Sequence, residues 1–388
     1  MDVRVGSEAK GDCTVEVRRG RAGGIEVETK NAELLGDGLR AVATETIAAL
    51  EAEDLAIRVA DSGALDYVVA ARIEAAVREA RPETEPIAPA VERRASPRDR
   101  PRRSRLYAPG NSPRLLAGID IHGADCVLFD LEDSVPPTEK ASARILVKHL
   151  LASVPFKDEV WVRINPLDGG GRDDLAEVLR GRPNGVCLPK AESAEDVRRL
   201  VEELSDLEAT LGIGHGATWV MPIVETARGV LHSEEIASAS DRVVMVAFGA
   251  EDFTRDIGAL RSDRSLHFAR SRIVAASAAA EVQASDTVYA DLENDVGLAE
   301  ESALARELGF DGKGAINPRQ LDSIHRAFSP TKEELAYARR VVEAAEEAEA
   351  IGSGAVALDG KMIDRPVLER ARRLIAYGEQ LAEGEVAK

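Results

Sequence analysis

Residues 220–230 are VMPIVETARGV, and residues 243–256, beyond a helical connection, are VVMVAFGAEDFTRD. Each segment is a short apolar run that ends in acid: Glu225 in the first, Glu251 and Asp252 in the second. Short apolar runs with β-branched residues and a following turn are typical of buried parallel strands. Carboxylates at the ends of such strands are expected at the mouth of a sheet or barrel, where α/β enzymes place their chemistry.

The carboxylates of Glu225 and Asp252 have two interpretations. Either one alone would be explained as a cap on the helix that follows it. Two hard oxygen ligands on adjacent strands instead suit a Mg²⁺ ion that keeps open positions for substrate. Because each carboxylate follows a clean strand, we favour the metal site.

The same strand pattern extends on both sides of this stretch. Candidate strands alternate with helical patterns and are SRLYAP, DCVLFDLED, EVWVRINP, GVCLPKAE, TWVMPIVE, RVVMVAFGAED, SDTVYAD and FDGKGAINP. Eight strands in this rhythm predict an α/β fold, a (β/α)₈ TIM barrel over residues 104–330. An open doubly wound sheet is the alternative, although no G-x-G-x-x-G follows the first strand, which weakens a dinucleotide-binding interpretation.

Three further segments flank the predicted barrel. Residues 1–80 alternate strands and helices and predict a small α+β domain, while residues 81–103 are rich in proline and charge and predict an extended linker. Residues 331–388 predict a C-terminal helical extension, with helices over 331–351 and 366–382 around a short strand and an Asp-Gly turn. Such a tail beyond a complete barrel is expected to pack on a neighbouring subunit.

Net charge, cysteine spacing and the lack of long apolar segments exclude several classes of function. The net charge of −19 argues against nucleic acid or an anionic membrane as the main partner. Cys13, Cys126 and Cys187 are far apart and lack CxxC spacing, so we expect reduced, structural thiols. The N-terminus has no apolar signal core and no stretch is long enough to span a bilayer, which predicts a cytoplasmic protein.

Polar residues gather where the other strands end. Arg163 lies within an apolar strand, and we weigh a structural ion pair with Asp130 or Glu132 equally against a grip on a substrate carboxylate or enolate oxygen. Lys190 could form a Schiff base in a metal-free aldolase, but we rank it first as an electrostatic contact because the Glu225/Asp252 pair is present. Flexible glycines near basic residues could hold phosphates, namely Gly110 and Gly312–Gly314 with Arg102, Arg103, Arg105, Arg114 and Arg319.

Asp364, in the tail, precedes Arg365-Pro366. It is either the N-cap of the last helix or a general acid or base delivered to the site of a neighbouring subunit.

Nine motifs, in order, resemble the β subunit of citrate lyase, of the HpcH/HpaI aldolase/citrate lyase family, and the malyl-CoA and citramalyl-CoA lyases of the same superfamily. They span Arg102 to about Leu381 and are RRSRLYAPGNSP, VLFDLEDSV, VRINPLD, LPKAES, PIVETARG, GAEDFTRDIG, DTVYAD, GFDGKGAINPRQ and LDGKMID. The resemblance implies a barrel that cleaves 3-hydroxy-acid thioesters with Mg²⁺.

The resemblance also implies roles for residues. Glu225 and Asp252 would be Mg²⁺ ligands, Arg163 would hold the substrate carboxylate or thioester oxygen, and Asp364 would be the acid/base in the adjacent protomer's site. Contacts to coenzyme A would come from the turn Pro109, Gly110 and Asn111, from Arg114, and from the GKGAINP loop that contains Asn317.

The first domain resembles the acyl-carrier γ subunit of citrate lyase, through VGSEAKGDCTVEV, GDGLRA and DSGALDYVVAARIEAAVREA. That family attaches its prosthetic group to a serine immediately before Gly-Asp, and Lys10 occupies that place here. Ser7 could serve only with a re-registered loop. We therefore expect no prosthetic-group attachment and a lyase that works on free coenzyme A thioesters.

The sequence thus predicts a Mg²⁺-dependent carbon–carbon lyase that cleaves citryl-CoA to oxaloacetate and acetyl-CoA. A malyl-CoA or citramalyl-CoA lyase is the alternative within the class, and a non-catalytic assembly subunit is the alternative outside it. A homotrimer or higher oligomer would let each tail reach the next site. A citrate lyase α-type subunit is a further candidate partner.

Overall fold

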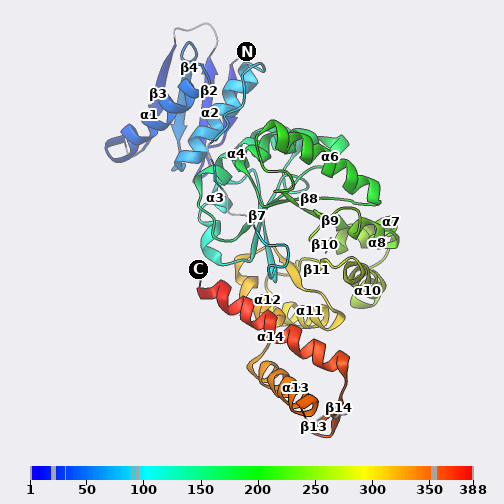
Figure 1. Cartoon of the computed structure of the whole chain (residues 1–388). Helices are drawn as coiled ribbons and strands as arrows, with labels where there is room; N and C mark the ends of the chain where they lie inside the picture. The colour runs from blue at the N-terminus through cyan, green and yellow to red at the C-terminus, as the bar shows by residue number, and fades with distance from the viewer. Residues whose placement is uncertain are drawn as a thin grey trace.

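The computed structural model describes residues 2–18, 23–30, 32–89, 91–92, 96–350 and 356–386. Figure 1 shows a small sheet domain at the N-terminus, a barrel in the middle and a pair of long helices at the C-terminus. Residues 19–22 of the predicted small domain, the expected helix end at Ile351 and residues 90 and 93–95 of the predicted linker lie outside the described residues.

Eight parallel strands close into a barrel in the order in which they follow along the chain. The ring is complete because β12 pairs with β5 and β9 pairs with β10. This closure confirms the (β/α)₈ prediction over the open doubly wound sheet. The strands are β5 (Ser104–Pro109), β6 (Cys126–Asp130), β7 (Glu159–Arg163), β8 (Gly185–Leu188), β9 (Trp219–Val224), β10 (Met245–Phe248), β11 (Gln283–Asp286) and β12 (Gly312–Ala315).

Helices surround the barrel and bury their apolar sides on it (Figure 1). The longer ones are α4 (Lys140–Ser153), α5 (Gly171–Val178), α6 (Ala194–Thr210), α10 (Asp263–Ala279), α11 (Asp295–Leu308) and α12 (Leu321–Phe328). Short ones fill the connections: α3 (Pro113–Leu116), α7 (Ala227–Leu231), α8 (Ser233–Ala237), α9 (Ala250–Asp256), and the 3₁₀ helices η1 (Ile119–His122), η2 (Pro137–Glu139), η3 (Leu167–Gly169), η4 (Leu179–Gly181) and η5 (Pro318–Gln320). None of the described helices has the length and apolar composition needed to cross a bilayer.

The seventh strand differs from the prediction. The expected segment SDTVYAD covers residues 285–291, whereas β11 ends at Asp286. The carboxylate of Asp286 is fully buried and accepts hydrogen bonds from Lys313 Nζ at 2.8 Å and from Arg270 Nε at 3.0 Å. Lys313 therefore belongs to the ion pairs of the core, and its expected role in a phosphate-binding loop was wrong.

The end of the predicted linker also differs from the expectation. Arg102 Nε lies 2.7 Å from Glu159 Oε2, and Arg103 Nε lies 2.8 Å from Asp125 Oδ2, with all four side chains buried. These pairs are at the amino ends of the strands, the rim opposite the carboxylates that end them. Arg102 and Arg103 therefore close the bottom of the barrel and are not available to phosphates at its mouth.

The N-terminal domain is a four-stranded sheet in the order β1-β2-β4-β3, with β3 and β4 parallel and the other pairs antiparallel. β4 alternates buried and half-buried residues, whereas Cys13–Val15 of β2 are all buried, and apolar residues of the two helices pack against the sheet. The elements are β1 (Val3–Gly6), β2 (Cys13–Arg18), β3 (Gly24–Glu28), α1 (Ala32–Ala49), β4 (Ala56–Asp61) and α2 (Asp66–Ala80).

Buried ion pairs fix the N-terminal domain to the barrel. Glu74, on α2, is 0 % exposed and contacts two residues of α4, Lys148 Nζ at 2.6 Å and His149 Nε2 at 2.6 Å. Lys148 also lies 2.6 Å from Glu177 Oε1, and Glu177 lies 2.7 Å from Arg78. Because these contacts join α2 to the barrel helices α4 and α5, the N-terminal domain is docked on the barrel and is not a loosely tethered arm.

The tail forms a helical pair beyond the barrel (Figure 1). It contains α13 (Lys332–Ala350), β13 (Val356–Leu358), β14 (Lys361–Ile363) and α14 (Arg365–Val386). A small separate cluster of Ala338, Val341, Ile363 and Ala371 holds these elements together. The two short strands turn at Asp359 and Gly360, where φ is 50° and 75°.

We predict that Glu74→Gln lowers the free energy of unfolding by about 3 kcal/mol, because it removes the buried charge that Lys148 and His149 share and leaves Lys148 with Glu177 alone. Burial alone would raise the pKa of Glu74, but the hydrogen bond from His149 and the charge of Lys148 outweigh it and lower the pKa from 4.5 to about 2. This stabilisation is therefore complete above about pH 4.5 and is lost as the pH falls towards 2.

Denaturant unfolding between pH 7 and pH 2 measures this effect. The matched control is Glu79→Gln, an exposed glutamate on the same helix. Equal unfolding midpoints for the two variants at pH 7 would contradict the docking role of Glu74.

Candidate active site

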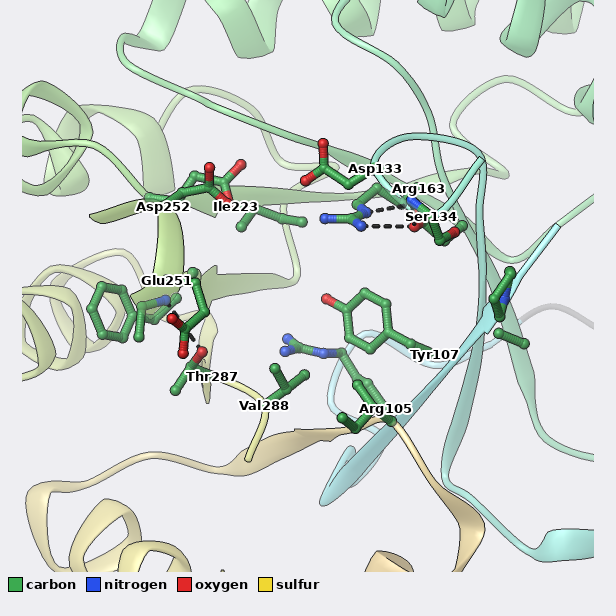
Figure 2. A pocket seen from close by; sticks show the side chains of 18 of the residues that line it. Arg105, Tyr107, Asp133, Ser134, Arg163, Ile223, Glu251, Asp252, Thr287 and Val288 are labelled. Atoms are coloured by element: carbon green, nitrogen blue, oxygen red, sulfur yellow. Dashed lines mark hydrogen bonds and ion pairs between the residues drawn. The ribbon is translucent and has the colours of Figure 1, made fainter. Parts of the chain in front are cut away.

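A cavity of about 520 Å³ opens where the barrel strands end. Figure 2 shows Glu251 and Asp252 on one side of this cavity and Tyr107 and Ser134 on the other. Its charged lining residues are Arg105, Asp130, Asp133, Arg163, Glu225, Glu251 and Asp252. Parallel strands bring their carboxyl ends to one rim, so residues far apart in sequence converge there.

Glu225 directly follows β9 and is only 3 % exposed. Its Oε1 accepts a hydrogen bond from the backbone N–H of Lys190 at 2.8 Å. A Cβ at Gly249 would lie 2.4 Å from Glu225 Oε2, so the carboxylate fits only because residue 249 is glycine. Burial, together with the charges of Asp252 and Glu132, raises the pKa of Glu225 to about 7.

Asp252 lies in the first turn of α9 and lines the same cavity. It pairs with Arg255, an exposed side chain three residues along the helix. The structure thus brings Glu225 and Asp252 to one cavity, close enough for Asp252 to raise the pKa of Glu225.

The donor set at this point fits a hard divalent cation. A buried carboxylate with a second carboxylate beside it is relieved of the repulsion when a cation binds between them. Within the described residues, no group of three or more His, Cys, Asp or Glu side chains is arranged to hold a metal ion. Glu225 and Asp252 could supply two ligands to a Mg²⁺ ion, which would keep positions open for substrate and water.

Arg163 ends β7 and contacts both of the carboxylates that were considered for it. Its Nε and Nη2 donate to Asp130 at 2.7 and 2.8 Å, and its Nη1 lies 3.0 Å from Glu132 Oε2. Burial alone would lower the pKa of Arg163, but the hydrogen bonds to Asp130 raise it well above its usual value. The guanidinium still lines the cavity, so the structural pair and the exposure to substrate coexist.

Lys190 lies beside this cluster with a positive φ of 52°. Its Nζ is 2.5 Å from Glu132 Oε1 and 3.9 Å from Asp133 Oδ1. Burial alone would lower the pKa of Lys190, but the hydrogen bond to Glu132 raises it. A Schiff base needs a neutral amine, so this environment favours the electrostatic role over the nucleophilic one.

The residues expected to contact coenzyme A are distributed around the mouth. Pro109 lines the cavity, and Gly110 donates its N–H to the carbonyl of Asp130 at 2.8 Å. Asn111 instead donates to Glu139 at 2.7 Å and lines a second cavity, between the two domains. Asn317 is outside the lining and caps η5, accepting from the N–H of Arg319 at 3.0 Å.

Arg114 is exposed and lies next to the N-terminal domain. A Cβ placed on Gly11 would be 3.7 Å from the Cα of Arg114. The loop that carries Lys10 is therefore adjacent to α3, the short helix that follows the first barrel strand.

Asp364 does not line the cavity of its own chain. It is exposed, and its Oδ1 accepts a hydrogen bond from the N–H of Val367 at 3.1 Å. Its local role is therefore the N-cap of α14, and a catalytic role would need a second copy of the chain.

Sequence reasoning missed the inner wall formed by Arg105 and Tyr107. Arg105 is expected from the sequence to be a phosphate contact, as are Arg102, Arg103, Arg114 and Arg319, but it lies inside the barrel on β5 and is 1 % exposed. Strand alternation is the signal that could have found it, because residues 105, 107 and 109 share one face and line the cavity, which Ala108 also borders.

Comparisons with known proteins agree with this geometry. Residues 103–318 match the family model described as HpcH/HpaI aldolase/citrate lyase, and residues 1–80 match the acyl-carrier model described as malonate decarboxylase delta subunit. The citrate lyase subunit beta of Escherichia coli K12 is 43 % identical over 284 residues, which cover 72 % of this chain and 94 % of that protein.

Two further relatives extend the comparison. The human mitochondrial citramalyl-CoA lyase is 32 % identical over 303 residues, covering 73 % of this chain and 87 % of that protein. A crystal structure of the Mycobacterium tuberculosis protein CitE, in complex with magnesium, acetoacetate and coenzyme A, superposes with a TM-score of 0.60 at 32 % identity, over 73 % of this chain and 99 % of that one. The chain therefore belongs to the HpcH/HpaI aldolase/citrate lyase family and is an oxo-acid lyase homologous to the citrate lyase β subunit.

Proposed function

We propose that this chain cleaves a 3-hydroxyacyl coenzyme A thioester by Mg²⁺-dependent retro-Claisen chemistry, with citryl-CoA as the substrate and oxaloacetate and acetyl-CoA as the products. The observation that carries the proposal is the buried Glu225 beside Asp252 in a cavity that Arg163 also lines. The magnesium and coenzyme A bound by the Mycobacterium tuberculosis protein support it.

The reaction balances without a redox partner. The bond between the hydroxyl-bearing carbon and the thioester α-carbon breaks, the hydroxyl loses its proton, and its oxygen becomes the carbonyl of the oxo-acid. The electron pair of the broken bond becomes a thioester enolate, which takes up a proton to give the acetyl thioester. When bound, Mg²⁺ would acidify and orient the hydroxyl.

Different side chains bind the metal ion and stabilise the negative charge of the substrate. Glu225 and Asp252 hold the metal, and Arg163 provides the positive charge near the substrate carboxylate or the enolate oxygen. Asp130 and Glu132 fix the guanidinium of Arg163 in place, so it needs no reorganisation during the reaction. Lys190 adds a second positive charge and orients Glu225 through its N–H.

Asp364 of a neighbouring copy supplies the proton to the enolate carbon in this proposal. The β13–β14 hairpin that precedes it carries Met362, a side chain that is 73 % exposed. An exposed apolar side chain beside an exposed carboxylate fits a tail that packs on another protomer, in a homotrimer or higher assembly.

The coenzyme A portion leaves the barrel past Pro109 and Gly110 towards Arg114 in this proposal. Lys10 lies in the loop next to Arg114 and supplies a positive charge at the position where the carrier family has its attachment serine. We infer that the N-terminal domain carries no prosthetic group and that free coenzyme A thioesters are the substrates. Malyl-CoA and citramalyl-CoA are the alternative substrates of the same chemistry.

A non-catalytic assembly subunit is the second candidate function. The docked N-terminal domain favours it, because a domain fixed by the buried Glu74 and Lys148 cannot swing a covalent arm between sites. Such a domain could instead present a surface to a partner such as a citrate lyase α-type subunit. A cleavage assay separates the two functions.

We predict that the purified protein cleaves citryl-CoA with Mg²⁺, that EDTA removes the activity and that added Mg²⁺ restores it. Glu225→Gln should lower kcat/KM at least about 100-fold, because it removes a charged metal ligand. Glu300→Gln, an exposed carboxylate on α11, is the control and should retain full activity. Activity that survives EDTA would favour a Schiff base at Lys190, and no activity on any of the three thioesters would favour the assembly subunit.

We predict that Asp364→Asn and Glu225→Gln proteins, each inactive alone, regain activity when their subunits are exchanged. Mixed oligomers contain sites in which an intact Asp364 meets an intact Glu225. Re-mixing two preparations of the same variant is the control. If the mixture stays as inactive as the separate variants, the site is built within one chain.

We predict that intact-mass measurement of protein from its native host gives the mass of the unmodified chain. Ser7 donates a hydrogen bond to Asp12 at 2.8 Å, and Asp12 pairs with the buried Arg72 at 2.9 Å, so the hydroxyl is already engaged. Ser7→Ala provides the reference. A prosthetic-group mass that disappears in Ser7→Ala would overturn the inference of free thioesters.

A further inference from the structure

Arg105 is a buried cation in the wall of the cavity. It is the second residue of β5, is 1 % exposed and lines the space next to Tyr107. Figure 2 shows its guanidinium extending from the strand into the cavity, between Tyr107 and Thr287. A charged group in such a place needs compensation, because burial removes its hydration.

The described residues leave this guanidinium under-satisfied. Nη1 donates to the weak acceptor Met221 Sδ at 3.4 Å, and Nη2 donates to the backbone carbonyl of Asp286 at 3.3 Å. Nε has no partner, although a guanidinium offers five N–H donors. Among the described residues no carboxylate forms an ion pair with Arg105, and the Asp286 carboxylate is occupied by Arg270 and Lys313.

Other buried arginines of this chain are satisfied differently. Arg102 and Arg270 each have a bidentate carboxylate partner, Glu159 for the first and Asp286 for the second. The guanidinium of Arg105 is instead placed 5.9 Å from the ring centre of Tyr107, and the guanidinium of Arg163 is 5.6 Å from the same ring. Two cations therefore lie near one aromatic ring along one wall, and of the two only Arg163 has a carboxylate partner within the described part of the chain.

We propose that Arg105 determines substrate specificity by binding a second carboxylate of the acyl group. This inference rests on the proposed function and deepens it. The carboxylate on the hydroxyl-bearing carbon belongs at the Glu225, Asp252 and Arg163 end of the cavity. A carboxymethyl arm on the same carbon reaches Arg105, whose free N–H groups bind it, and Tyr107 separates the two anion positions.

The candidate thioesters differ in the third substituent on the hydroxyl-bearing carbon, the group that would face Arg105. A citryl group carries the carboxymethyl arm, a citramalyl group carries a methyl group in its place, and a malyl group carries hydrogen. Without the arm, Arg105 stays buried and unpaired in the complex, which disfavours the smaller substrates. Arg105 thus makes the site specific for an acyl group that carries two free carboxylates, such as citryl.

The test compares Arg105→Met with the unmodified chain on citryl-CoA and citramalyl-CoA. We expect kcat/KM for citryl-CoA to fall at least about 100-fold and kcat/KM for citramalyl-CoA to change less than about 5-fold. Arg105→Lys keeps the charge without the bidentate fork and should give an intermediate citryl-CoA value. Arg326→Met, an exposed arginine on α12, is the control and should match the unmodified chain.

A binding measurement separates this inference from the proposed function. With Mg²⁺ present, calorimetry should show at least about tenfold tighter binding of citrate than of citramalate by the unmodified chain, and equal binding by Arg105→Met. That result would uphold the Arg105 subsite even if no thioester were cleaved. Equal losses on both thioesters in Arg105→Met, or an unchanged citrate preference in a folded Arg105 variant, would overturn it while leaving the lyase activity intact.

Discussion

The repulsion between two acidic side chains at the mouth of the barrel is the constraint on which the site depends. Glu225 is buried, its pKa is raised to about 7, and the nearby charge of Asp252 contributes to that shift. The fold keeps this unfavourable pair together by hydrogen bonding Glu225 to the N–H of Lys190 and by leaving Gly249 without a side chain. A divalent cation would relieve the repulsion, so the two carboxylates are explained as the protein ligands of a metal ion.

The remaining charges of the barrel are arranged around this pair. At the bottom, Arg102 and Glu159 neutralise one another and close the structure. At the mouth, Arg163 is neutralised by Asp130 and Glu132 and still faces the cavity. Arg105 alone of the lining cations lacks a carboxylate partner among the described residues, which is why it bears on the choice of substrate.

Much of the fold could be predicted from the sequence, because buried parallel strands such as β9 are continuous apolar runs. The bounds of the seventh strand could not, since β11 ends at Asp286, whose charge is compensated by Lys313 of the neighbouring strand β12, and a pairing between strands leaves no local pattern. The residues of the active site were likewise predictable only where the local sequence shows them. Glu225 and Asp252 were visible as acids at strand ends, whereas Arg105 was hidden in a basic run that resembles a solvated loop. Asp364 is a helix cap by its local sequence, and any further role depends on contacts that one chain does not contain.

Titration of the metal-free protein with Mn²⁺ as a spectroscopic substitute for Mg²⁺ tests the central claim most directly. Electron paramagnetic resonance should report one bound ion per chain, and Mg²⁺ should displace it. Glu225→Gln and Asp252→Asn should each abolish the binding, while Glu300→Gln should retain it. Unchanged binding in both site variants would contradict the account, because the ion would then be held elsewhere and the two carboxylates would have no metal to share.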